Sequence, residues 1–398
     1  MRDLNGAIFN TELNDLCRKY LIKGPVELTH NETLEFPKKY NEIKSSIFES
    51  FILNKEINFK IEGENIPLCV LVNEIGLRGI EELIDDNALS FTLWEPMIFH
   101  MTDKIDGLIP IAAGRYNSGP YVDPEESINL GLGFMRSPLK KGEIRSLTRK
   151  IRDLYLFVPK GIENDCVSIT MSALESGKLE SLGLPAQDKI NNNLSAEEKN
   201  TLSKCASDLL SYKYLVRKHA SASPTSNVQI LLNDSIKKPL AMSKENIFSA
   251  ILKLEDFPDI KASFQSMGLP MDELIRVRKN KNSKKFRKWL NTFNSISDPI
   301  EAQRYYLESI QNPKGLFDSF LGKSTKSIAM MILGAYVGAQ VDTSIGPYVG
   351  ALGSKVAGPI TDYILDMADE YLLAELTKGW TPKIFIDDIK QLSFKYSV

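Results

Sequence analysis

The densest group of side chains that could bind a ligand is a basic run, Arg276–Lys288, in which eight of thirteen residues are Lys or Arg. Such groups neutralise phosphates of nucleic acid or of anionic lipid. A helix from Ser283 would place its basic residues near one face and turn Phe286 and Trp289 inward. The candidate anion-binding residues are Arg276, Arg278, Lys284, Lys285, Arg287 and Lys288. The alternatives are a solvated face and a patch neutralised by the chain's own carboxylates between residues 362 and 370.

A second motif, Gly322-Lys-Ser-Thr325, is similar to the end of a phosphate-binding loop. That loop needs a glycine five residues before Gly322, where this chain has Phe317, and a buried strand leading in. Because the backbone that would surround the phosphates is missing, the motif does not predict nucleotide hydrolysis. A helix capped by Ser324 explains the residues equally well.

The loop 113–122 leaves an expected strand and enters a helix that Asp123 and Pro124 can start. Polar groups at a strand end beside a helix amino terminus can hold an anion. Arg115, Tyr116 and Asn117 are therefore candidate ligand-binding residues. The alternative is a structural turn with an exposed arginine.

Histidine and cysteine give no sign of a metal or of nucleophilic catalysis. The three histidines (His30, His100 and His219) and the four cysteines (Cys17, Cys69, Cys166 and Cys205) are scattered and show no ligand spacing. No Gly-x-Ser-x-Gly elbow is present. We therefore expect no metal and no cofactor, and the sequence leaves open whether the protein is an enzyme, with the pattern favouring a non-enzymatic role.

The apolar segment 327–361 carries only two charged residues, Asp342 and Lys355. Two glycine pairs at a spacing of four make a smooth helical stripe on which another helix can lie close: Gly334 and Gly338, and Gly346 and Gly350. Gly346-Pro347 breaks the segment, which predicts a hairpin of two short helices. Its first arm is too short to cross a bilayer. The hairpin could form a buried core or dimer face, associate with a membrane after a trigger, or approach a ligand through its glycines.

The surrounding pattern predicts how these residues are positioned. Alternation of apolar and polar residues predicts a strand at 56–62, and segments 89–94 and 108–113 are further strand candidates. The glycines of 67–84 predict two short helices there. Helical periodicity dominates the rest of the chain. Ser195, Ser243 and Asp298 are expected helix caps.

The fold that follows is mainly α, with a mixed α/β amino-terminal region and an α-helical carboxyl-terminal domain built on the glycine-rich hairpin. The small, polar segment 220–226 reads as a linker. It separates a mixed α/β domain, 1–219, from a helical domain, 227–398. A sub-boundary near residue 137 is a further expectation.

Composition excludes several classes of protein. The apolar share of 43% and charged share of 25% are those of a globular chain, and the net charge of −2 provides no general attraction to polyanions. Four dispersed cysteines and no apolar leader predict a cytoplasmic protein, with the inner face of the membrane as a conditional site.

These features favour a non-enzymatic effector or assembly protein whose hairpin mediates oligomerisation or conditional membrane association. Such an arrangement would suit a bacterial toxin-like or antiviral (phage-defence) effector. Its expected partners are another protein or a second copy, and an anionic membrane. The alternatives are a nucleic-acid-binding module using residues 276–288, and an enzyme or ligand sensor with a site in the amino-terminal region.

Overall fold

The computed structural model describes residues 4, 7–22, 27–101, 109–185, 194–220, 225–232, 243–256, 260–267, 270–291, 298–311 and 380–396. It divides into two compact units. The first consists of Met1–Lys44, Asn54–Asn233 and Pro270–Ile275, and the second of Ser45–Leu53, Asp234–Leu269 and Arg276–Val398. The expected mainly helical chain with a mixed α/β amino-terminal region is confirmed.

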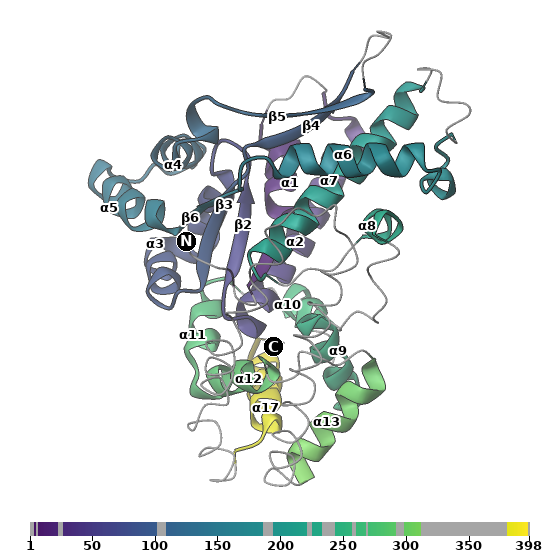
Figure 1. Ribbon diagram of the computed structural model, residues 1–398. Coiled ribbons are helices and arrows are strands. Elements are labelled where there is room, and N and C mark those ends of the chain that lie inside the picture. The colour runs from purple at the N-terminus through teal and green to yellow at the C-terminus, as the bar shows by residue number, and fades with distance from the viewer. Residues whose placement is uncertain are drawn as a thin grey trace, which may run out of the picture. The chain divides into compact units, whose positions relative to one another are not determined.

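A four-stranded parallel sheet forms the centre of the first unit, in the order β1-β2-β3-β6 (Figure 1). Its strands are β1 (Ile8–Asn10), β2 (Ile57–Ile61), β3 (Leu89–Leu93) and β6 (Tyr155–Phe157). In register, Ile57 lies opposite Ile8 and Leu89, and Phe91 lies opposite Tyr155. The predicted strands at 56–62 and 89–94 are confirmed as β2 and β3. Both are almost wholly buried, as strands of a sheet covered on both faces must be.

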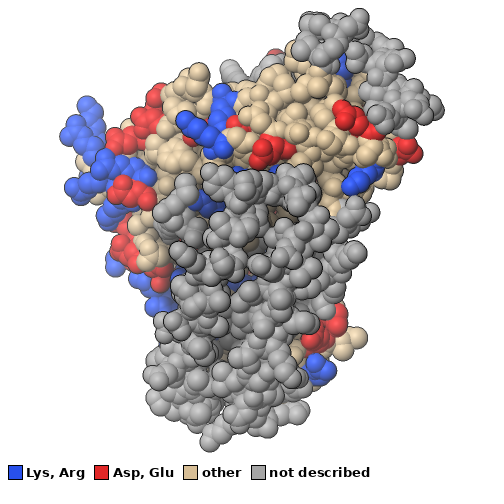
Figure 2. All heavy atoms as spheres, viewed as in Figure 1, with Lys and Arg blue, Asp and Glu red and all other residues tan. Residues whose placement is uncertain are grey.

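Helices connect the parallel strands, and those on one side of the sheet pack on one another. They are α1 (Glu12–Tyr20), α3 (Ile66–Asp85), α4 (Pro124–Leu132) and α5 (Lys141–Ile151), with two 3-10 turns, η1 (Gly119–Tyr121) and η2 (Arg152–Leu154). A left-handed backbone at Gly76, with a φ of 81°, kinks α3 into the two short segments that the sequence predicts. The outer surface near α5 is rich in charged side chains (Figures 1 and 2).

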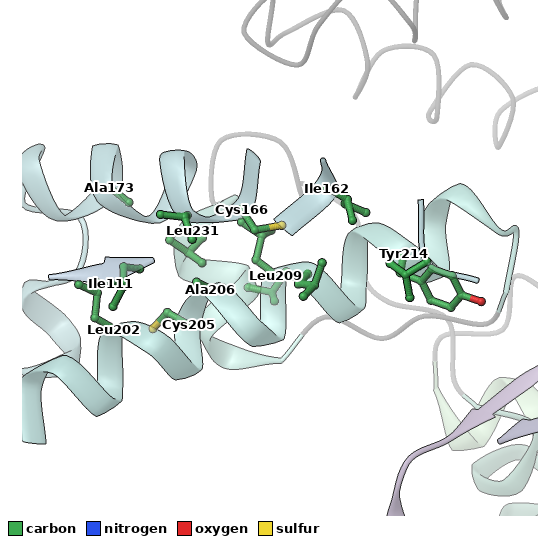
Figure 3. Close-up of a cluster of buried hydrophobic side chains, with 14 of the residues drawn as sticks. Ile111, Ile162, Cys166, Ala173, Leu202, Cys205, Ala206, Leu209, Tyr214 and Leu231 are labelled. Atoms are coloured by element: carbon green, nitrogen blue, oxygen red, sulfur yellow. The ribbon is translucent and has the colours of Figure 1, made fainter. Parts of the chain in front are cut away.

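An apolar core on the other side joins two long helices to a β-hairpin. The elements are β4 (Pro96–His100), β5 (Ile111–Arg115), α6 (Ile162–Glu175), η3 (Glu180–Leu182), α7 (Ala196–Arg217) and α8 (Ser226–Leu231). Figure 3 shows Leu202, Ala206 and Leu209 of α7 among the side chains that fill it, with Ile162 and Ala173 from α6. This core fixes the hairpin whose last residue is Arg115.

Five polar residues form a hydrogen-bonded seam between the sheet and α7. Thr92 contacts the Tyr214 hydroxyl at 2.7 Å and donates to Asn58 Oδ1 at 2.6 Å. Asn58 Nδ2 donates to Ser90, whose hydroxyl donates to Glu56. Asn58, Ser90, Thr92 and Tyr214 are fully buried. Because buried polar groups must be paired, the seam specifies how α7 sits on the sheet.

Caps that the sequence predicts are present. Asp123 Oδ1 accepts from the Glu125 amide, and Ser195 forms a reciprocal capping box with Glu198. Ser243 Oγ and Asp298 Oδ1 accept from helix amides in the same way. These caps satisfy amides that have no partner within the helix and therefore fix where each helix begins.

The second unit is helical, and one carboxylate joins three of its helices. Its elements include the end of α2 (His30–Leu53) and the helices α9 (Lys244–Leu254), α10 (Ile260–Met267), α12 (Lys281–Asn291), α13 (Pro299–Gln311) and α17 (Pro382–Tyr396), and α11 (Glu273–Lys279) leads into it. Phe286 stacks on Phe385 with ring centroids 4.3 Å apart. Glu255, at the end of α9, accepts from Tyr306 of α13 and from Lys383 and Lys390 of α17.

The expected hairpin 327–361 lies outside the described residues, and so do Gly334, Gly338, Gly346 and Gly350. Within the described part of the chain, no helix has both the length and the apolar character needed to cross a bilayer.

Candidate functional site

The carboxyl ends of the parallel strands gather the polar side chains of the first unit. Ligands of open parallel sheets bind at this edge, because the loops there carry backbone and side-chain groups outside the packed layers. Here β2 is followed by Glu62 and Glu64, and β3 by Glu95. Helix α1 follows β1 directly and adds Asn14 from its first turn and Arg18 from its last turn.

Arg18 is the centre of this edge. Its Nη1 donates to Glu64 Oε2 at 2.9 Å, and its Nη2 donates to the Tyr121 hydroxyl at 2.8 Å and to the Glu62 carbonyl. The guanidinium carbon lies 5.7 Å from the Tyr121 ring centroid. These bonds use three of the five N–H donors of an arginine. Among the described residues nothing accepts from the other two, and the side chain is 24% exposed.

A second cation and two acids lie next to Arg18. Lys60 pairs with Glu62 at 2.6 Å and lies over the Trp94 ring. The pKa of the Asp15 carboxyl is raised, chiefly by burial and further by Glu62, while Lys60 acts in the opposite sense. A carboxyl whose pKa is raised beside other charged groups is typical of functional sites.

Buried polar hydrogen bonds hold the segment that follows β2 against β6 and α4. Asn65 Nδ2 donates to the Tyr155 hydroxyl at 2.6 Å, and Ser127 Oγ donates to the Gly63 carbonyl at 2.5 Å. Burial raises the pKa of the Tyr155 hydroxyl, which stays protonated. Gly131 of α4 packs directly against the backbone of Asn65, and an added Cβ would lie 2.2 Å from the Asn65 carbonyl oxygen. Only glycine permits this approach.

An aromatic pair stands at the side of the site. Tyr116 stacks on Tyr121 with centroids 4.1 Å apart, and Tyr116 is 39% exposed. A planar ring of a ligand can stack on such an exposed face. Of the three loop residues that the sequence indicates, Tyr116 thus lies at this edge beside Tyr121, and Asn117 is exposed.

Arg115, the third loop residue, has no donor left for a ligand. Its five N–H groups donate to Glu163 (two bonds), to Glu95, and to the carbonyls of Val158 and Pro159, at 2.6–3.0 Å. The side chain is 16% exposed, and Glu163 7%. The contact ties the hairpin to the ends of β3 and β6. Arg115 therefore positions the edge and is neither an exposed arginine nor an open anion site.

The basic run divides between the surface and the interior of the second unit. Arg276, Lys284 and Lys288 are exposed, whereas Arg278, Lys285 and Arg287 are buried. Arg278 donates to the Phe51 carbonyl and Arg287 to the Ile52 carbonyl, both in the last turn of α2. Those carbonyls have no partner within their own helix, and they attract cations. Lys285 lies over the Trp380 ring.

The four cysteines are buried thiols. Burial raises the pKa of Cys17 and Cys166 to about 12 and that of Cys205 to about 11, and it also raises the pKa of Cys69. Figure 3 shows Cys166 and Cys205 within the apolar core. A protonated, buried thiol is a poor nucleophile. Among residues with described positions, no three acidic, His or Cys side chains are grouped to hold a metal ion.

Comparisons of this chain with protein-family models, with curated proteins and with solved structures gave no match.

Proposed function

We propose that the first unit binds a small polar ligand at the carboxyl edge of its sheet, and that the chain is a ligand-responsive effector. The observation that carries the proposal is Arg18, a half-buried guanidinium held by Glu64 and Tyr121, with two N–H donors that no described residue uses. A prearranged cation at this edge is suited to the anionic group of a ligand.

The other groups favour a nucleotide-like ligand. The exposed ring of Tyr116 offers a stacking face for a base. Carboxylates are acceptors for ribose hydroxyls, and this edge offers two: that of Glu64, bound to Arg18, and that of Glu62, paired with Lys60. The amino end of α1 adds the positive end of a helix dipole at the same edge. Together these groups would recognise a ring, a sugar and one anionic group.

The response is assigned to the helical carboxyl-terminal part. The apolar composition and paired glycines of segment 327–361 support self-association or conditional membrane association. In this proposal the protein acts in the cytoplasm or at the inner face of the membrane, as a bacterial toxin-like or antiviral effector does. Flotation with anionic liposomes, in the presence and absence of the ligand, tests the proposed membrane association. Gly338→Leu and Gly350→Leu are the variants to compare with wild type. If the wild-type protein never floats with the liposomes, the proposed membrane association is contradicted.

Calorimetric titration of the full chain with adenosine, AMP, ATP and NAD tests the proposed ligand binding by the first unit. We expect at least one nucleotide to bind, and Arg18→Met to weaken its binding about 10- to 100-fold, the effect of losing a charged hydrogen bond. Arg78→Met is the matched control, because the Arg78 side chain is 92% exposed on the outer face of α3. Binding that is equal in the two variants, or no binding by any probe, refutes the proposal.

A further inference from the structure

A second basic surface, which is not a dense run in the sequence, lies on α5. Between Arg136 and Arg152 the chain has seven basic residues and one acid, Glu143. The carboxylate of Glu143 caps the start of the helix, where it accepts a hydrogen bond from the Lys140 amide. The segment is therefore strongly cationic within a chain whose net charge is −2.

The helix arranges these charges in a line. Lys141, Arg145 and Arg149 are four residues apart, so they follow one face at intervals of about 6 Å along the axis. All three are exposed, as are Arg136 and Lys140 ahead of them. Leu147 and Ile151, on the opposite face, are fully buried and anchor the helix in the first unit. We call the five exposed residues the α5 stripe: Arg136, Lys140, Lys141, Arg145 and Arg149.

Within the described part of the chain, the cations of the α5 stripe have no ion-pair partner. The other two basic residues of the segment are paired, Lys150 with Glu81 at 2.8 Å and Arg152 with Glu125 at 2.6 Å. No described carboxylate lies within 4.0 Å of a stripe cation. In Figure 2, blue side chains gather where Figure 1 places α5. The charge of the stripe is thus available to a partner.

We propose that the α5 stripe binds the phosphate backbone of a single nucleic-acid strand. The charges form a line along one helix, which fits a linear polyanion better than the plane of a lipid surface. Three of the five are arginines, whose forked donors match phosphate oxygens. A membrane-bound helix would also turn its apolar residues to the lipid, whereas Leu147 and Ile151 are inside the protein.

Fluorescence anisotropy with labelled 20-nucleotide RNA and DNA strands tests the proposal. Binding should weaken with salt, with a log–log slope of about −0.7 for each phosphate contact. Replacing Lys141, Arg145 and Arg149 together by Ala should weaken binding at least tenfold near 50 mM salt and reduce the slope by about 2. Arg145→Lys with Arg149→Lys, which keeps the charge, should retain most of the salt dependence.

The control is the equivalent change on the other basic helix, Lys281, Lys284 and Lys288 of α12 to Ala, all exposed. This control should bind as wild type does, and circular dichroism should show that both triple variants are folded. The proposal is overturned if neither strand binds at about 50 mM salt, or if the α12 variant loses binding and the α5 variant does not. Binding to phosphatidylserine vesicles without binding to either strand also overturns it.

Discussion

Replacing Arg115 by Met should strongly destabilise the first unit. The substitution removes five hydrogen bonds and leaves the carboxylates of Glu95 and Glu163, 12% and 7% exposed, without their cation. Among described groups Glu163 then keeps only backbone amides, such as that of Gly161 at 3.3 Å. Removing one partner of a buried ion pair costs about 3–5 kcal/mol. We expect a loss in this range in the free energy of unfolding.

Urea denaturation followed by the fluorescence of Trp94, which is buried in the first unit, measures the effect. The two tryptophans of the second unit are replaced by Phe in wild type and variant alike, so that the signal reports one unit. Adding Glu163→Gln to Arg115→Met should recover part of the loss, because one unpaired charge is removed. A cost below about 1 kcal/mol for Arg115→Met would show that the network is not structural.

Three further predictions concern the fold. Gly131→Ala should destabilise the first unit by about 1–3 kcal/mol by thermal unfolding, since its Cβ would overlap a backbone carbonyl; the control Gly142→Ala, in α5 with open space, should be neutral or slightly stabilising. Tyr214→Phe should cost about 1–2 kcal/mol in urea, because the seam loses a buried hydroxyl. The pKa of Glu255 is lowered, because burial, which raises it, is outweighed by its hydrogen bonds to Lys and Tyr. Wild type should therefore lose stability as pH falls from about 4.5 through the folded pKa, and Glu255→Gln should show a flatter profile over that interval in pH-dependent unfolding.

Local features of the fold were predictable from the sequence. Alternation within 56–62 and the caps at Asp123 and Ser195 depend on neighbouring residues only, and β2, α4 and α7 confirm them. The three-residue strands β1 and β6 were not predicted. They are too short to show a period, and pairing with β2 and β3 stabilises them.

The candidate site was harder to predict, because its residues are far apart in the chain. Arg18 and Tyr121 meet only when α1 and η1 reach the same edge of the sheet. One signal was available: Glu62 ends the expected strand 56–62 and Glu64 follows it, at a position where polar residues often bind a ligand. Arg115 illustrates the opposite case, since an arginine in a loop gives no sign in sequence of whether five acceptors will surround it.

Charge density in the sequence was a poor guide to the basic surfaces. The run 276–288 spans the end of α11 and most of α12, and its closely spaced basic residues fall on different faces of these helices, so Arg278, Lys285 and Arg287 are buried. The α5 stripe has fewer charges per residue, yet a spacing of four places Lys141 and Arg149 on the same exposed face. The spacing of basic residues along a helix therefore predicts an exposed basic surface better than their density in the sequence does.

Hydrogen–deuterium exchange with saturating AMP, or with the tightest nucleotide of the panel, tests the ligand site most directly. We predict slower exchange in the segments of the carboxyl edge, 11–18, 62–66 and 116–123, and unchanged exchange at the opposite ends of the strands, 54–57 and 86–90. Arg18→Met should reduce this protection at a nucleotide concentration that only just saturates the wild type. Protection confined to the opposite ends, or bound nucleotide without protection of the carboxyl edge, would contradict the account.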